Sequence, residues 1–439
     1  METLHIGGGG ARHHRPARGR RGGGPPLRLV LRQAAPDWGP SRASLANRSW
    51  FELQWALASH GSCRTVEAIA LLEQSARHAR AAGAGPVAVA AREQIALMYA
   101  VAGYTQTAVE HLGAAGSRPR GSAVARLIEG ILLLDRLDPR ASDCFSIPGA
   151  DDIEEWAVVA WARTQYAMLF GDPIVALAEV NRMAVRHLHT SRQGSANRYL
   201  VDRAVADLGL ALGELDRAQR HLGECGSLES LFAVPRARLA YICGDHAKAG
   251  GIAAAHAWEP ATTLRDRIEL VMLRAAAALA RKDAEGARLQ FSRAHRLAAE
   301  TGTLIPYTAL PREACDRLLD LIGNPLAPSV VERIHEHRQP YPARGRLITL
   351  TPREKVVLGA MVEHETLADI AEELVLSLNT IKKQAHAVYA KLGVHDRQSA
   401  LLVANRLGLL PDPAPDPSPA GRAEEGSRAS RLPILPRTA

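Results

Sequence analysis

Length, composition and charge exclude several classes of protein. The chain has 439 residues, of which 47% are apolar, and it carries a formal net charge of +8. This length is typical of two or three domains, and the apolar content excludes collagen-like and wholly disordered chains. No apolar run approaches the roughly 20 residues that a membrane span needs, and the N-terminus lacks the apolar core of a secretory signal. Five widely spaced cysteines without a C-x-x-C pair favour reduced thiols. We therefore expect a soluble, cytoplasmic protein without a membrane partner.

The excess positive charge lies mainly at the N-terminus. Residues 1–32 carry +6, residues 33–343 are neutral, and residues 344–410 carry +2. Residues 1–42 are rich in Gly and Arg and cannot bury enough apolar surface to offset the entropy of ordering, so we expect a disordered leader. Either this leader contacts nucleic acid without sequence preference, or it is dispensable.

Residues 43–322 are expected to form a stack of helix pairs. They are rich in Ala, Leu and Arg, and apolar residues recur at i, i+3 and i+4. Turns recur every 31 to 42 residues, which scatter around the period of about 34 residues of tetratricopeptide repeats. Where the turn begins with Gly, this residue is expected to cap the first helix in the left-handed conformation, and an Ala in each motif lets the next helix cross closely. The turns lie at Gly103, Asp138, Gly171, Gly213, Gly244 and Lys282.

The fold class that this pattern predicts is all-α, with a tetratricopeptide-like α-solenoid. Such a stack either serves as a spacer and dimerisation body or offers a concave surface to a peptide, a protein or a small effector. Residues 323–347 contain four prolines and predict a linker with a short helix around Ser329–His337. Residues 411–439 form a Pro-rich tail that we expect to be disordered.

Residues 348–410 predict four short helices with clear start signals. The first signal is a capping box with Pro at the first helical position, Thr351-Pro352-Arg353-Glu354. The other starts are expected at Thr366, Ser377 and Asp396, and the third helix should end at Gly393 and the fourth at Gly408.

The third of these helices has an unusual charge. Between Asn379 and Leu392 it carries three lysines and one histidine but no acidic residue. A short helix, a tight turn and a basic second helix are what a helix-turn-helix needs, because the second helix lies in the major groove of DNA. The segment therefore predicts a DNA-binding domain.

Four motifs in this segment resemble the LuxR-type (GerE/FixJ-like) DNA-binding domain, a four-helix bundle. They are LTPREKVVL at 350–358, DIAEEL at 369–374, S-x-NTIK at 377–382 and VYAKLGV at 388–394. Two positions depart from the family pattern: HETL at 364–367 replaces a Gly and a Ser-Asn pair, and Gln384 replaces a frequent His. The repeat region resembles MalT-like regulators, but the ATPase module is lacking because the chain has no G-x-x-x-x-G-K-[ST] motif.

The resemblance implies roles for individual residues. Base contacts would fall on Lys382, Lys383 and His386, and phosphate contacts on Thr380 and Lys391. The fourth helix would form the dimer contact, with Leu401, Leu402 and Asn405 as candidates.

These observations predict a sequence-specific transcriptional regulator and no enzyme. Neither G-x-S-x-G nor H-E-x-x-H occurs, so we expect no catalytic site, cofactor or metal. The expected partner is double-stranded DNA, bound by a homodimer, with RNA polymerase considered as a further partner. The repeat domain would bind an effector or protein partner that the sequence does not identify. The alternatives are a helical-repeat interaction scaffold with a vestigial helix-turn-helix, or a fragment of an ATP-dependent regulator.

Overall fold

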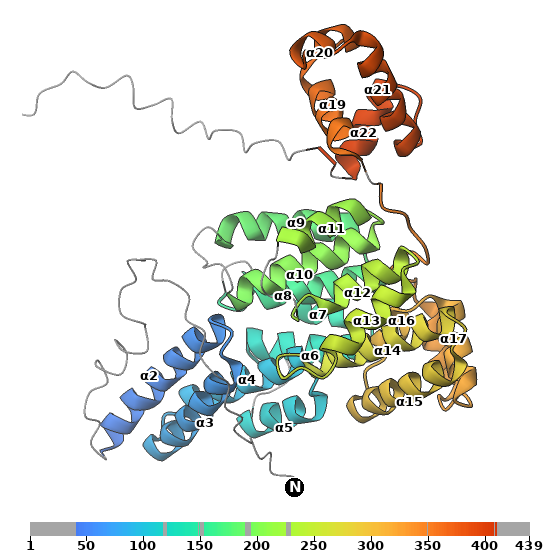
Figure 1. The fold of residues 1–439 in the computed structure, drawn as a ribbon. Coiled ribbons are helices and arrows are strands. Elements are labelled where there is room, and N and C mark those ends of the chain that lie inside the picture. The colour runs from blue at the N-terminus through green and yellow to red at the C-terminus, as the bar shows by residue number, and fades with distance from the viewer. Residues whose placement is uncertain are drawn as a thin grey trace, which may run out of the picture.

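The computed structural model describes residues 41–116, 121–147, 149, 153–188, 195–224, 230–348, 350–407 and 409–410. Within these ranges the regular elements are helices, and no strand occurs (Figure 1). The all-α prediction is therefore confirmed. The leader as far as residue 40 and the tail from residue 411 lie outside the described residues. In the described part of the chain, no helix combines the length and the apolar character that a membrane crossing needs.

Successive helix pairs build the larger part of the molecule. The first helices of the pairs are α2 (Arg42–Gly61), α4 (Gly85–Ala102), α6 (Ala123–Asp135), α8 (Trp156–Phe170), α10 (Ala196–Ala211), α12 (Ala233–Ile242) and α14 (Leu264–Ala280). The second helices are α3 (Thr65–Ala82), α5 (Thr105–Ala115), α7 (Ala141–Phe145), α9 (Pro173–His187), α11 (Leu215–Glu224), α13 (His246–His256) and α15 (Ala284–Thr301). Each second helix packs on the first helix of its pair. The short α16 (Ile305–Thr308), α17 (Arg312–Leu321) and α18 (Pro328–Glu336) follow, and α18 is the short helix expected in the linker.

The turns between paired helices follow the predicted chemistry in part. Gly103, Gly213 and Gly244 adopt φ of 89°, 74° and 81°, which is the left-handed conformation expected of them. The prediction is wrong at Gly171, which has φ −116° and is extended. There the next residue already caps α9, so no left-handed residue is needed, and a Cβ on Gly171 would lie 3.1 Å from Ala167 Cα.

The small residue near the start of each second helix is buried, as expected for close helix crossing. The six alanines concerned have exposed fractions of 5% or less. They are Ala108, Ala141, Ala176, Ala218, Ala249 and Ala287.

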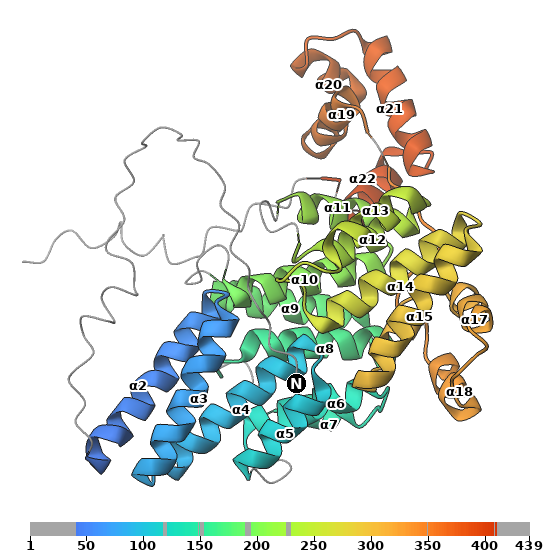
Figure 2. The ribbon, with the colours of Figure 1, turned by 60° about the horizontal axis from the view of Figure 1, so that its bottom comes forward.

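The stack winds tightly enough for distant helices to touch. The N-terminal end of α14 reaches α4 and α6, because Arg265 donates to the Ala100 carbonyl (3.0 Å) and pairs with Asp135 (2.5 Å). Figure 2 shows α14 crossing the body between the early helices and α15 to α18. Helices α8, α12 and α14 are consequently buried on most sides. The inner helices α8, α10, α12 and α14 pack on one another in chain order.

Charged residues are buried inside this body. Arg203 pairs with Asp207 (2.8 Å) and Asp266 (2.9 Å), and Arg238 pairs with Glu269 (2.6 Å). Burial opposes the charge of Glu269, but the neighbouring Arg238 and Arg203 outweigh this effect and lower the pKa of its carboxyl group. The pairs are needed because an unpaired charge in this interior would be strongly destabilising.

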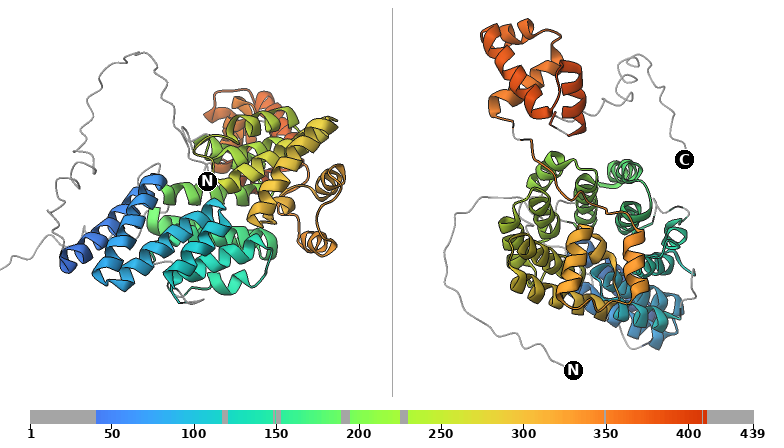
Figure 3. Two further views of the ribbon diagram at one scale, coloured as in Figure 1. Left: turned by 90° about the horizontal axis from the view of Figure 1, so that it is seen from below. Right: turned by 90° about the vertical axis from the view of Figure 1, so that its right-hand side faces the viewer.

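The last four helices form a domain with a hydrophobic core of its own. They are α19 (Pro352–Glu363), α20 (Leu367–Glu373), α21 (Leu378–Leu392) and α22 (Arg397–Arg406). Their core includes Leu358, Met361, Ile370, Ile381 and Val388. The domain stands apart from the repeat body and is joined to it by one chain segment (Figure 3).

Candidate nucleic-acid interface

Local hydrogen bonds start the four helices at the predicted residues. The Thr351 hydroxyl accepts from the Glu354 amide and the Glu354 carboxylate accepts from the Thr351 amide (2.7 Å), which is a complete capping box. Thr366 forms a second capping box with Asp369. The side chains of Ser377 and Asp396 cap α21 and α22. These bonds satisfy backbone N–H groups that have no partner inside the helix.

The turn between α20 and α21 places a valine in the left-handed conformation. Val375 has φ 53° and is 88% exposed. The Leu376 amide donates to the Ala371 carbonyl (2.9 Å) and the Val375 amide to the Glu372 carbonyl (3.2 Å), as in a Schellman helix end. The tight turn required of a helix-turn-helix is thus present, with a β-branched residue where glycine fits best.

Helix α21 divides into a buried and an exposed face. Ile381, Val388 and other apolar residues pack into the domain core, whereas Lys382, Lys383 and His386 are exposed. His386 lies four positions from Lys382 and three from Lys383, so it is a neighbour of both on the helix surface, and all three candidate base contacts are exposed. The structure therefore brings these predicted residues to one surface.

The two predicted phosphate contacts lie at opposite ends of α21. Thr380 is half-buried in the first turn, with its hydroxyl 2.8 Å from that of Ser377. The Lys391 ammonium lies in the last turn, 2.6 Å from a Glu354 carboxylate oxygen. Burial opposes the charge of Glu354, but hydrogen bonds from Lys391 and Thr351 outweigh it and hold the pKa of this carboxyl group below its usual value. A phosphate contact by Lys391 would compete with this ion pair, so that role stays a prediction.

The candidate dimer contacts on α22 differ in exposure. Leu402 is 67% exposed, and Asn405 is also exposed. Leu401 is half-buried and packs against the domain core. Arg397 fixes this helix by donating to the carbonyls of Met361 and His364, both at 2.6 Å.

Comparison with known families decides what this four-helix arrangement is. Residues 348–404 match the family model described as bacterial regulatory proteins, luxR family. This domain is a LuxR-type helix-turn-helix. The match confirms the resemblance for this part of the chain, which is a DNA-binding domain of a transcription regulator. Comparisons with curated proteins and with solved structures give no match, and the MalT-like resemblance of the repeat body is not confirmed.

The structure of the LuxR-type domain contains features that sequence reasoning missed. Glu363, His364 and Glu373 each offer a ligand atom, and these atoms lie within 4.8 Å of one another. Such nitrogen and oxygen atoms can ligate a transition-metal ion, and here His364 pairs with Glu373 at 2.8 Å. The cluster was not apparent because Glu373 comes from α20, whereas the other two residues end α19.

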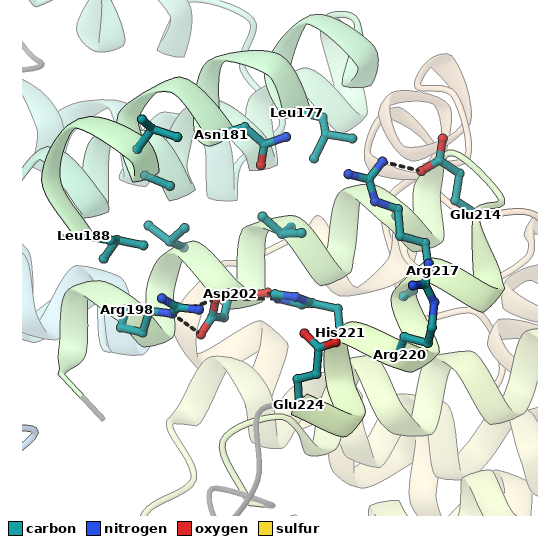
Figure 4. A pocket seen from close by; sticks show the side chains of 16 residues that line it. Leu177, Asn181, Leu188, Arg198, Asp202, Glu214, Arg217, Arg220, His221 and Glu224 are labelled. Atoms are coloured by element: carbon teal, nitrogen blue, oxygen red, sulfur yellow. Dashed lines mark hydrogen bonds and ion pairs between the residues drawn. The ribbon is translucent and has the colours of Figure 1, made fainter. Parts of the chain in front are cut away.

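A groove on the repeat body was missed as well. It lies between α9, α10 and α11 and encloses a cavity of about 350 Å³. Leu177, Asn181 and Leu188 lie along one wall, and the charged residues of α10 and α11 lie opposite (Figure 4). Arg198 pairs with Asp202 (2.9 Å), and Arg217 lies 3.5 Å from Glu214. The groove depends on the spacing of three helices, for which the sequence carries no direct signal.

Proposed function

We propose that the chain is a sequence-specific transcriptional regulator that reads duplex DNA with α21. The observation that carries this proposal is the exposed face of Lys382, Lys383 and His386 on the second helix of a LuxR-type helix-turn-helix. No acidic residue lies on α21 to repel phosphate. Helix α20 would support α21 from outside the groove, as in other helix-turn-helix proteins.

The chemistry of the three side chains suits direct reading of bases. The ammonium groups of Lys382 and Lys383 donate hydrogen bonds, and the N7 and O6 atoms of guanine in the major groove accept them. His386 lies one turn further along the same face and can donate or accept. Thr380, at the N-terminal end of α21, is the better placed phosphate contact, because helix N-termini attract anions.

We further infer that two chains bind a two-fold-symmetric site. Leu402 and Asn405 lie three positions apart on α22, and an exposed leucine of this size suits a helix–helix contact. Symmetric dimers bind symmetric half-sites one DNA turn apart or at multiples of that distance. We also propose a cytoplasmic location, because the matched family model describes bacterial proteins, and RNA polymerase stays a predicted further partner.

The first experiment compares DNA binding by a Lys382→Ala/Lys383→Ala variant of the full chain with that by a Lys248→Ala control. A duplex selected from a random pool is titrated by fluorescence anisotropy at two salt concentrations. We expect the double variant to lose about 1–3 kcal/mol for each base contact, roughly 5- to 150-fold in affinity. Its salt dependence should also become less steep, because fewer phosphate-bound cations are displaced.

The controls make this result specific. Lys248 is an exposed residue of α13 in the repeat body, so its loss should leave the affinity unchanged. Equal binding by the wild type and the double variant would contradict the DNA-reading role of α21. One chain per duplex, instead of two, would contradict the dimer. If the wild-type chain shows no salt-dependent binding to any duplex, the scaffold alternative is favoured.

For the repeat body we propose sensing of an effector or protein partner in the groove between α9, α10 and α11. The support is the combination of an apolar wall, charged residues of both signs and the 80% exposed Val185 beside them. A Val185→Asp variant should weaken an effector response without changing the affinity of the unliganded chain for DNA. An unchanged response would contradict sensing at this groove.

A further inference from the structure

The segment that joins the two parts of the molecule is bound to the repeat body along its length. We call residues 338–348 the strap. The sequence predicts most of it as a linker, yet its residues contact the ends of α8, α11 and α12. At its start, Arg338 donates to the Met168 carbonyl (3.0 Å), and Pro340 is buried.

Tyr341 ties the strap to the buried charges of the body. The Arg238 guanidinium lies 4.0 Å from the centre of the Tyr341 ring and donates to its hydroxyl (3.2 Å). Arg238 is 2% exposed and is itself held by Glu269. A buried cation stacked on an aromatic ring is attracted to it more strongly than at an exposed site. The half-buried Tyr341 therefore packs against the interior of the repeat body, although it lies outside the repeats in the sequence.

Gly345 allows the strap to approach α11 and α12 closely. Its amide donates to the carbonyl of Ile242, the last residue of α12 (2.9 Å). A Cβ at this position would overlap Leu215 Cδ1 and lie 3.1 Å from Ile242 Cγ2. The close approach thus depends on the absence of a side chain at Gly345.

Asp216 makes the last contact of the strap. Both of its carboxylate oxygens lie 3.0 Å from the Ile348 amide nitrogen, which donates to them. Asp216 is 8% exposed, so water competes little for this bond. Two positions later, Leu350 is 3% exposed in the core of the LuxR-type domain. Ile348, the last residue held by the repeat body, and Leu350, a residue of the domain core, are therefore two positions apart in the sequence.

We propose that Asp216, Arg238 and Tyr341 are positioning residues that hold the LuxR-type domain on the repeat body, so that the two tumble as one unit. Their effect on DNA rests on the proposed function, because they set the direction in which α21 faces. Helix α11 carries Asp216 and also Arg217 and His221 of the groove wall, and Glu214 of that wall directly precedes it. A ligand in the groove would therefore act on the helix that holds the end of the strap.

The experiment measures how fast α21 tumbles in the full chain without DNA. Amide nitrogen relaxation by NMR is recorded for the wild type and for an Asp216→Ala/Tyr341→Ala variant. In the wild type, the α21 amides should show the slow tumbling of the whole 47.2 kDa chain. In the double variant they should show a several-fold shorter correlation time, because the small domain moves by itself.

Conservative variants separate positioning from folding. Asp216→Asn keeps a carbonyl acceptor for Ile348, and Tyr341→Phe keeps the ring over Arg238, so both should tumble as the wild type does. Fast tumbling of α21 in the wild type, or slow tumbling in a folded double variant, overturns the proposal. If the double variant does not fold, the wild-type measurement decides alone. A wild-type chain that does not bind DNA contradicts the proposed function, whereas the tumbling result is independent of it.

Discussion

At the scale of single residues, the LuxR-type domain shows both what local sequence predicts and what it misses. Thr351, Thr366, Ser377 and Asp396 cap their helices as expected, because each bond joins residues three positions apart. Val375 was not expected in a left-handed turn, because β-branched residues disfavour it. Both α20 and α21 pack into the domain core, and only a tight turn connects them in this arrangement. This packing holds Val375 in the left-handed conformation.

Replacing Val375 with glycine should stabilise the LuxR-type domain. The left-handed conformation costs a side chain of this kind about 1–2 kcal/mol, and the greater entropy of unfolded glycine offsets part of this, so we expect a net gain of about 1 kcal/mol. Almost no packing is lost, because Val375 is 88% exposed. Urea unfolding of the full chain, followed by hydrogen exchange of α21, measures the change.

The matched control is Val356→Gly, a 53% exposed valine within the right-handed α19. It should destabilise the domain by roughly 0.5–1 kcal/mol, because glycine is a poor helix former. Destabilisation by both substitutions would show that Val375 is not strained.

At the scale of helices, small residues set how closely the paired helices pack. Gly130 in α6 faces α7, and a Cβ there would overlap Phe145 Cε1 and lie 2.9 Å from Cys144 Cβ. A Cβ added to Gly113 in α5 would have none of these neighbouring atoms within 4 Å. The two glycines are alike in the sequence, since both lie within a predicted helix, and only the packing of the next helix distinguishes them.

Alanine at these two positions should have opposite effects. Gly130→Ala should destabilise the repeat body by about 1–3 kcal/mol, because overpacking outweighs the better helix propensity. Gly113→Ala should stabilise it by about 0.5–1 kcal/mol through propensity alone. Thermal unfolding measured by circular dichroism reports both, and a stabilised Gly130→Ala variant would show that α7 moves away at little cost.

At the scale of the whole molecule, buried ion pairs connect helices that are distant in the sequence. Asp135 at the end of α6 accepts from both terminal nitrogens of Arg265 in α14, at 2.5 and 2.9 Å, and from the Thr303 hydroxyl. Asp135 is 2% exposed. This contact joins α14 to the much earlier helix α6. The strap contacts the buried charged residues of the same body through Tyr341.

Removal of the Asp135 carboxylate should destabilise the repeat body strongly. Asp135→Ala leaves the buried Arg265 guanidinium without its counterion, so we expect a loss of about 3–5 kcal/mol in the free energy of unfolding. Urea denaturation measures this loss. The control is Arg198→Ala, whose side chain is 47% exposed and pairs with Asp202 at the surface. It should change stability little, since exposed pairs contribute little. Similar small losses for both variants would contradict the role of Asp135 in joining α14 to α6.

The sequence by itself determined the helices, their caps, the repeating pairs and the LuxR-type domain with its basic α21. These features depend on hydrogen bonds and apolar patterns among residues that are close in the sequence, so the sequence alone predicts them. Only the tertiary structure decided that Lys391 pairs with Glu354, that α14 returns to α6, and that the expected linker is held by Asp216 and Arg238. These contacts join residues 37 to 132 positions apart, and they form only where the packing of helices excludes water and brings opposite charges together.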